Sequence, residues 1–138
     1  MNYAIGGSFT SRLNMNLRED KSWSYGVRNR LADAKGQRSI LVNAPVQTDK
    51  TADSIKEIIK EFEYYLGDQP IRYDELEKAK SSKTLRLPGR FETLGSLLGG
   101  MTNIVQYDRS LNYLDELSSL YSEPTLEEVQ NTARKYLK

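Results

Sequence analysis

The stretch that most constrains the fold of this chain lies between residues 6 and 27. It begins with the pair Gly6-Gly7, and glycine is common just past the end of a helix. Phe9, Leu13 and Leu17 follow at intervals of four residues, which places them on one face of a short helix. The stretch therefore predicts a glycine turn, a helix, a tight turn and a strand in quick succession.

Two strands are expected next. The first is indicated by residues at alternate positions, which would share one buried face of a sheet: Trp23, Tyr25, Val27, Asn29 and Leu31. The second is Ser39–Val46, with Lys35-Gly36 forming the turn between them. Because the second strand is apolar over consecutive residues, we expect it to be central and covered on at least one side.

The remainder of the chain has helical periodicity. A threonine or aspartate at 48–49 can begin a helix that ends at Gly67, and Pro88-Gly89 can close the next helix. Helices are expected over about 48–66, 74–87, 91–107, 112–121 and 126–138. The apolar stripe of the first contains Ala52, Ile55, Ile58, Ile59, Phe62 and Leu66. The expected core stripe of the third contains Leu94, Leu97, Leu98, Met101, Ile104 and Val105.

These elements predict an α+β domain with too few strands. A lone two-stranded ribbon is marginally stable, and two strands under several helices make a lopsided layer. We therefore expect that further strands lie outside the chain, so that residues 1–138 would be one partial domain, truncated at both ends.

Composition excludes several classes of site. The chain has 138 residues with no histidine and no cysteine, so the common zinc ligands and the commonest general base are absent. Its net charge is +1, which argues against a nucleic acid as a partner because phosphate binding needs a basic excess. No apolar run is long enough to span a membrane. Compartment stays open.

Arg18 and Tyr25 are the residues best placed to carry chemistry. Seven residues apart, they stand at the expected helix end and strand start, where a fixed cation and a phenol hydroxyl could face one spot. Taken singly, each has a plainer interpretation. An arginine at a helix C-terminus is favoured by the helix dipole, and a strand tyrosine commonly packs with its hydroxyl at the rim.

Several sequence blocks occur in a definite order over nearly the whole chain. They are Gly6–Leu13, Leu17–Glu19, Trp23–Val27, Val46–Thr51, Asp74–Leu76 with Ala79-Lys80, Leu87–Thr93 and Thr125–Val129. Their order resembles the insulinase, or pitrilysin, family of zinc metallopeptidases, which includes the mitochondrial processing peptidases. The match is to the C-terminal copy of its repeated domain, which lacks zinc. The resemblance implies a two-layer α/β sandwich with an antiparallel-rich sheet and helices on one face.

The resemblance implies roles for particular residues. Arg18 and Tyr25 match an arginine and tyrosine pair that this lobe supplies in active members, where they position substrate and stabilise the transition state. Gly6, Gly7 and Ser8 are expected to bind substrate beside them. The resemblance places zinc, with its inverted H-x-x-E-H motif, in the N-terminal lobe or a paired subunit, so this chain would hold no metal and would be inactive alone.

Other functions stay open at this stage. The chain could belong to a member without peptidase activity that holds peptides or acts as a scaffold subunit. A nucleic-acid-binding domain is a weaker alternative, because its only support is a basic run that is also typical of a solvated helix face: Lys78, Lys80, Lys83, Arg86 and Arg90. A domain with strands missing is also expected to expose apolar surface and to self-associate.

Two charged residues near the helix expected from residue 74 add minor expectations. Glu75 is expected to be a solvated charge that favours the helix dipole. Arg72 stands where the family commonly has a threonine cap, and losing such a cap weakens a helix start by about 1 kcal/mol.

Overall fold

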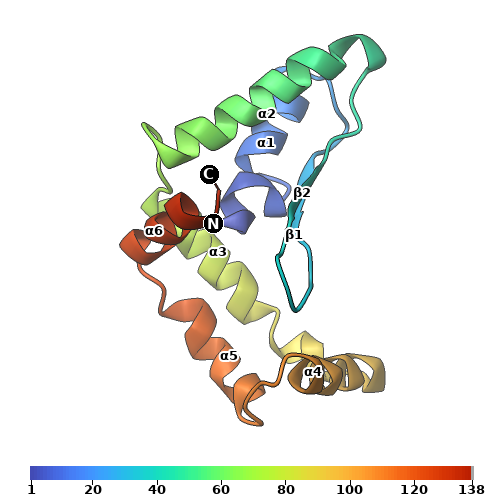
Figure 1. The fold of residues 1–138 in the computed structure, drawn as a ribbon, viewed down its shortest axis with the longest axis vertical. Helices are drawn as coiled ribbons and strands as arrows, with labels where there is room; N and C mark the ends of the chain where they lie inside the picture. The colour runs from blue at the N-terminus through green and yellow to red at the C-terminus, as the bar shows by residue number, and fades with distance from the viewer. Residues whose placement is uncertain (138) are drawn as a thin grey trace. The chain divides into compact units, whose positions relative to one another are not determined.

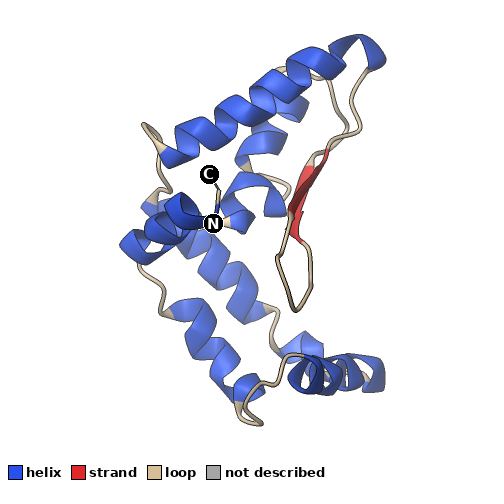
Figure 2. Cartoon of the chain, in the orientation of Figure 1, coloured by secondary structure: helices blue, strands red, loops and turns tan. Residues whose placement is uncertain are grey.

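The computed structural model describes residues 1–137. Within that range there are six α-helices, two strands and four short π or 3-10 segments (Figure 1; Figure 2). In chain order they are η1 (Tyr3–Gly7), α1 (Arg12–Asn14), η2 (Met15–Asp20), β1 (Arg28–Leu31), β2 (Ile40–Asn43), η3 (Thr48–Lys50), α2 (Thr51–Leu66), α3 (Tyr73–Leu85), η4 (Pro88–Phe91), α4 (Leu94–Gln106), α5 (Tyr113–Ser122) and α6 (Leu126–Tyr136). The α+β class is confirmed, with helices predominating.

The first helices differ from the expectation at their ends. η1 includes Gly6 and ends at Gly7, with Ser8 as its C-cap, so the glycines lie in the helical segment rather than after it. α1 begins only at Arg12 and continues directly into η2. Leu13 and Leu17 are fully buried as expected, whereas Phe9 precedes the helix and is 64% exposed. Phe9 is therefore wrongly placed in the predicted core stripe.

The sheet consists of β1 and β2 paired antiparallel, with Arg28 opposite Asn43 and Leu31 opposite Ile40. The connection is longer than a two-residue turn, although the Ala32 N–H still donates to the Ser39 carbonyl at 2.8 Å. Within residues 1–137, β2 pairs with β1 alone and alternates between half-buried and exposed residues. The expectation of a central, covered strand is wrong for the part of the chain described.

The chain divides into two compact units. One comprises residues 1–75 and 126–138, and the other comprises residues 76–125. In the first, α2 contacts α1, η1, η2 and α6. Its buried apolar side chains, as far as the structure describes them, are Ala4, Ile5, Leu13, Leu17, Val27, Tyr65, Ile71 and Ala133. All the candidate site residues belong to this unit.

The helix α2 buries its predicted apolar stripe only in part, with Ile58, Phe62 and Leu66 half-buried. Its fully buried residues are Ser54 and Tyr65, while Ile55 and Ile59 are more than half exposed. α2 contacts α1 and η2, and the Asn16 side chain of η2 donates hydrogen bonds to Glu57 and Glu61 of α2. The packing of α2 therefore includes polar contacts that its apolar pattern does not predict.

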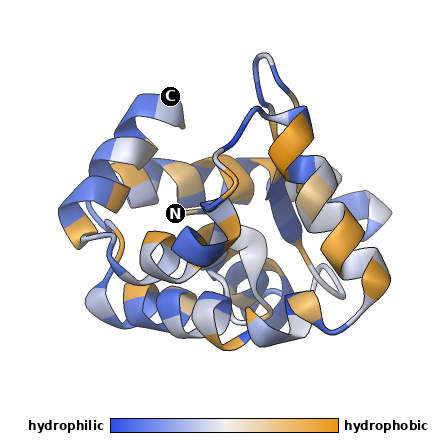
Figure 3. Ribbon diagram, turned by 90° about the horizontal axis from the view of Figure 1, so that it is seen from below, coloured by the Kyte–Doolittle hydropathy of each residue, from blue (hydrophilic) through white to orange (hydrophobic). Residues whose placement is uncertain are grey.

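The second unit contains the most apolar helix, α4, and buries none of it fully. The stripe predicted as core is largely exposed, with Leu94, Leu98, Met101 and Val105 all more than half accessible. Figure 3 shows hydrophobic residues recurring along the helices with hydrophilic residues between them. Among residues 1–137, no helix is both long enough and apolar enough to span a membrane.

Candidate functional site

Gly6, Gly7 and Ser8 form the end of η1 and the start of the loop to α1. Gly6 is buried, and Ser8 has extended backbone geometry. The Ser8 carbonyl accepts hydrogen bonds from the Ser11 N–H at 3.2 Å and from Asn14 Nδ2 at 3.0 Å. The loop is thus held against the first turn of α1.

Gly6 permits a close approach between η1 and β1. A Cβ atom built at Gly6 would lie 2.9 Å from Asn29 Cγ and 3.0 Å from the Asn29 backbone nitrogen. The φ angle of Gly6 is not positive, so the requirement for glycine here comes from contact and not from backbone conformation. The role of the glycine pair is close packing, and a phosphate-binding loop has no support.

Replacing Gly6 by alanine is expected to destabilise the protein by about 1–3 kcal/mol, the usual cost of overpacking a tight contact. One of the clashing atoms belongs to the β1 backbone, so relief requires η1 and β1 to separate. Urea denaturation measures the change in the free energy of unfolding. Gly36→Ala is the matched control, because nothing lies within 4 Å of a Cβ there. Equal stability of the two variants would contradict the packing argument.

Arg18 lies in the last turn of η2, as expected for a cation at a helix end. Its Cζ atom is 4.0 Å from the centroid of the Phe9 ring, which is a stacked cation–π contact. Its Nη1 atom also donates to the carboxylate of Glu19. Phe9, which was predicted to be a core residue, is therefore exposed, and its ring packs against the guanidinium of Arg18.

Tyr25 lies outside β1, at a bend in the chain, and its side chain is 93% exposed. The prediction that it shares a buried strand face with Val27 is wrong. Ser24 pairs with Val46, and Arg28 pairs with Asn43. Three residues lie between Ser24 and Arg28, whereas two lie between their partners Val46 and Asn43, so the Tyr25 segment carries one extra residue. This β-bulge turns Tyr25 away from the core.

Hydrogen bonds hold the backbone of the bulge on both sides of Tyr25. Ser24 Oγ lies 2.8 Å from the Pro45 carbonyl oxygen and accepts a hydrogen bond from the Gly26 N–H at 3.1 Å. On the other side, the Val27 N–H donates to Asn14 Oδ1 at 2.8 Å, and Asn14 Nδ2 donates to the Val27 carbonyl at 2.7 Å. An exposed tyrosine therefore stands on a fixed backbone.

Arg12 forms an ion pair that sequence reasoning missed. Its Nε and Nη2 atoms donate to the two carboxylate oxygens of Glu75 at 2.7 and 2.6 Å, and its remaining donors reach the Gln69 and Pro70 carbonyls. The side chains of Arg12 and Glu75 are only 11% and 12% exposed. The expectation that Glu75 is a solvated charge is wrong.

The environment of Glu75 lowers its pKa. Burial raises the pKa, but hydrogen bonds from Arg12 and from the Arg72 N–H, together with both positive charges, lower it further than burial raises it. The contact with the Arg72 N–H at 2.9 Å is half of a capping box, because Glu75 is the third residue of α3. This contact gives α3 a cap that Arg72 itself does not supply. The sequence signal that could have indicated the Arg12–Glu75 ion pair is an arginine placed among the regularly spaced apolar residues of α1.

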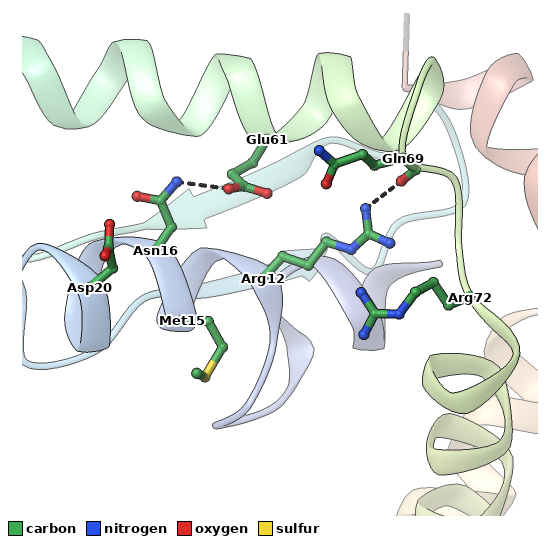
Figure 4. A pocket seen from close by; sticks show the side chains of 7 residues that line it. All are labelled: Arg12, Met15, Asn16, Asp20, Glu61, Gln69 and Arg72. Carbon is green, nitrogen blue, oxygen red and sulfur yellow. Dashed lines mark hydrogen bonds between the residues drawn. The ribbon is translucent and has the colours of Figure 1, made fainter.

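A pocket of about 310 Å³ opens beside Arg12 (Figure 4). Its lining residues carry both signs of charge and are Arg12, Met15, Asn16, Asp20, Glu61, Gln69 and Arg72. Arg12 donates across it to Gln69, and Asn16 donates to Glu61 at 2.7 Å. The side-chain donors of Arg12 and Asn16 are thus engaged, whereas Asn16 Oδ1 is buried without a hydrogen-bond partner.

The residues described do not fit a zinc ion. Among residues 1–137, no three acidic side chains gather closely enough to hold a metal, and the whole chain has no histidine or cysteine. No chemical step is therefore assigned to a metal on this chain.

The basic run is partly engaged in contacts within the second unit. Lys80 pairs with Glu77 at 3.3 Å, and Arg90 donates to the Tyr121 hydroxyl at 3.3 Å. Lys83 lies 5.9 Å from the centroid of the same tyrosine ring. These contacts favour the structural interpretation of the run.

Comparison with known families identifies the family to which the first unit belongs. The family model described as the peptidase M16 inactive domain matches residues 1–83. This chain belongs to the peptidase M16 family. The resemblance to the C-terminal, inactive domain of the insulinase family is thereby confirmed, and the match spans the positions of Arg18 and Tyr25. M16 is a family of zinc proteases, and the zinc site is not in this domain.

Solved structures share the fold of this M16 domain. A peptidase M16 inactive domain from Pseudomonas fluorescens is 22% identical, with a TM-score of 0.87 over 99% of this chain and 32% of that one. A conserved protein from Enterococcus faecalis is 20% identical, with a TM-score of 0.82 over 97% and 31%. A protease from Helicobacter pylori is 17% identical, with a TM-score of 0.79 over 99% and 33%.

At these identities the likeness shows the fold alone. The M16 chain spans about a third of the length of those three solved chains. No curated protein matches it.

Proposed function

We propose that this chain is the substrate-binding lobe of a zinc-dependent endopeptidase and supplies Arg18 and Tyr25 to a zinc site on another lobe. The observation that carries the proposal is the presentation of Tyr25. Its side chain is 93% exposed although the backbone on both sides is fixed by hydrogen bonds to buried or half-buried groups. An exposed phenol carried on a fixed backbone suits a donor that acts on something outside the lobe.

Arg18 is proposed to hold the substrate backbone. A guanidinium presents several N–H donors in a plane, and peptide carbonyls accept charge-assisted hydrogen bonds from them. Stacking on Phe9 covers the face of the guanidinium and leaves its edge for hydrogen bonding. Glu19 engages one terminal nitrogen, which restricts the orientation of the group before substrate arrives. Gly6, Gly7 and Ser8 are proposed to line the same peptide-binding edge.

Tyr25 is proposed to stabilise the transition state. When a peptide bond is attacked, negative charge develops on the carbonyl oxygen, and a fixed hydroxyl can donate to that oxyanion. The metal, which activates water in this class of enzyme, belongs to the other lobe. Tyr25 would reach the reacting carbonyl only when the lobes close on a peptide, so closure would gate the reaction.

The partners follow from this proposal. They are a peptide substrate and a zinc-bearing lobe, on the same polypeptide or on a paired subunit, with no nucleic acid. We also propose that β1 and β2 belong to a larger antiparallel-rich sheet with helices on one face, supported by the half-exposed Leu41 on β2. Exposed apolar residues on α4 favour self-association of the chain when it is alone.

The alternative is a member without peptidase activity that uses the same edge to bind peptides or partner proteins. Both functions share the Arg18 contact with a peptide backbone, and they differ in whether Tyr25 takes part in a reaction. The exposed, fixed position of Tyr25 favours the peptidase.

The lobe is expected to cleave no peptide by itself, with or without added zinc. Combined with a zinc-bearing M16 lobe, it should restore hydrolysis of a fluorogenic peptide, and a chelator should abolish that hydrolysis. The zinc-bearing lobe alone is the control for background activity. Chelator-sensitive cleavage by this chain alone would contradict the proposal, as would a combined activity no higher than that of the zinc-bearing lobe alone.

A further inference from the structure

Beside the Tyr25 bulge, the side chain of Asn14 makes the backbone hydrogen bonds that a neighbouring β-strand would make. Its Oδ1 accepts from the Val27 N–H at 2.8 Å, and its Nδ2 donates to the Val27 carbonyl at 2.7 Å. The same Nδ2 lies 3.0 Å from the Ser8 carbonyl oxygen. Asn14 is 3% exposed and Val27 is fully buried. One buried amide thus satisfies backbone groups of both the Ser8 loop and the bulged segment.

The position of Asn14 in the chain makes these contacts relevant to the proposed pair. Asn14 is the last residue of α1, which continues without a break into the η2 segment that carries Arg18. Val27 follows Tyr25 by two residues and is where the bulge rejoins β1. The Asn14 amide is therefore a direct link between the helix bearing the arginine and the segment bearing the tyrosine.

A second link limits the freedom of the same segment. The N–H groups of Trp23 and Ser24 both donate to the Leu17 carbonyl, at 2.9 and 3.2 Å. Ser22, just before them, has a positive φ of 54°, which is unfavourable for a residue other than glycine. The turn from η2 to Tyr25 is fixed on its upstream side by these contacts and on its downstream side by Asn14.

We propose that Asn14 is a positioning residue for Tyr25. Its amide holds the bulge in the conformation that turns the phenol outward and sets the tyrosine relative to Arg18. The inference rests on the proposed function, because it assigns Asn14 an effect on catalysis only through Tyr25. Losing the amide frees the backbone around the tyrosine without touching the phenol itself.

A double-mutant cycle in the complete protein, with both lobes and zinc present, tests this role. Asn14→Ala is expected to lower kcat by about 10- to 100-fold with KM changed by less than about threefold, since a small misplacement of a reacting group has effects of this size. In a Tyr25→Phe background, the same change is expected to lower kcat by less than about twofold further. Hydrogen exchange of the Val27 amide should accelerate in Asn14→Ala.

Gln130→Ala is the matched control. Gln130 is also a buried amide that bonds two backbone groups, donating to the Tyr65 carbonyl at 3.0 Å and accepting from the Ile71 N–H at 3.4 Å. Its two hydrogen bonds link α2 to the segment before α3, so its loss should lower stability and leave kcat unchanged. Should Asn14→Ala fail to fold, Asn14→Asp serves in its place, because it keeps the acceptor for the Val27 N–H and loses only the donors.

The outcomes distinguish a failure of the Asn14 positioning role from a failure of the proposed function. If Tyr25→Phe itself leaves kcat unchanged, the proposed function fails and the inference falls with it. If Tyr25→Phe lowers kcat but the Asn14 substitution lowers it by the same factor in both backgrounds, only the positioning role is overturned. Unchanged exchange of the Val27 amide in Asn14→Ala would also overturn it; in Asn14→Asp, which keeps the acceptor of that amide, the kcat values of the cycle alone decide.

Discussion

Replacing Tyr25 by phenylalanine in the complete two-lobed protein is expected to lower kcat by about 10²- to 10³-fold with little change in KM. Removing one hydrogen-bond donor from an oxyanion has effects of this size, because the donor acts on charge that exists only in the transition state. The ring and the backbone of the bulge stay in place, so substrate binding should persist. Initial rates over a range of peptide concentrations give kcat and KM separately.

Tyr136→Phe is the control for removing an exposed phenol, since Tyr136 lies on α6 and is well exposed. It should leave both kinetic constants unchanged. A Tyr25→Phe enzyme with unchanged kcat would remove the catalytic role and favour the peptide-binding alternative. An increase in KM with unchanged kcat would instead place the tyrosine hydroxyl in ground-state binding.

The second large effect concerns Arg12, whose replacement by alanine should lower the free energy of unfolding by about 2–4 kcal/mol. Breaking a largely buried ion pair leaves the carboxylate of Glu75 without its bidentate partner. The Gln69 and Pro70 carbonyls lose a donor as well. Urea denaturation followed by circular dichroism measures the loss.

The same ion pair predicts an acid-dependent loss of stability. Because the folded protein lowers the pKa of Glu75, the ionised carboxylate contributes stability above its unfolded pKa of about 4.3, and this contribution is lost as pH falls through the folded value. Stability measured between about pH 6 and pH 3 should fall less steeply in Glu75→Gln, which is uncharged throughout.

Asp53→Asn is the control for both variants, because the Asp53–Lys56 pair lies on the exposed side of α2. Exposed ion pairs contribute little to stability, so this change should leave the free energy of unfolding and its pH dependence nearly unchanged. If the Arg12 and Glu75 variants behave like the Asp53 variant, the pair is not a structural anchor.

The sequence predicted the local elements well because they depend on neighbouring residues. Gly67 ends α2, its N–H donating to the Glu63 carbonyl at 2.9 Å, as a glycine after an amphipathic run predicts. The order of helices and strands, the α+β class and the family also followed from local patterns and spaced motifs. Leu13 and Leu17 were correctly placed in the core by periodicity alone.

Burial predictions failed where a tertiary contact replaced the local rule. Alternation placed Tyr25 inward, but one extra residue between Ser24 and Arg28 reverses the direction of its side chain. Helical spacing placed Phe9 in the core, but the helix begins later and the ring stacks on Arg18. Neither a bulge nor a helix start has a strong signature in the residues beside it.

The sequence by itself determined which residue types the site can contain. It placed Arg18 at a helix end and Tyr25 near a strand, and with no histidine or cysteine it left no conventional zinc ligand set on this chain. Only the tertiary structure decided how those residues are presented. The exposure of Tyr25 and the Asn14 contact depend on backbone groups distant in sequence, which must find hydrogen-bond partners when they are buried. The stacking of Arg18 depends on where the chain places the Phe9 ring. That requirement acts across the fold and leaves no periodic pattern in the chain.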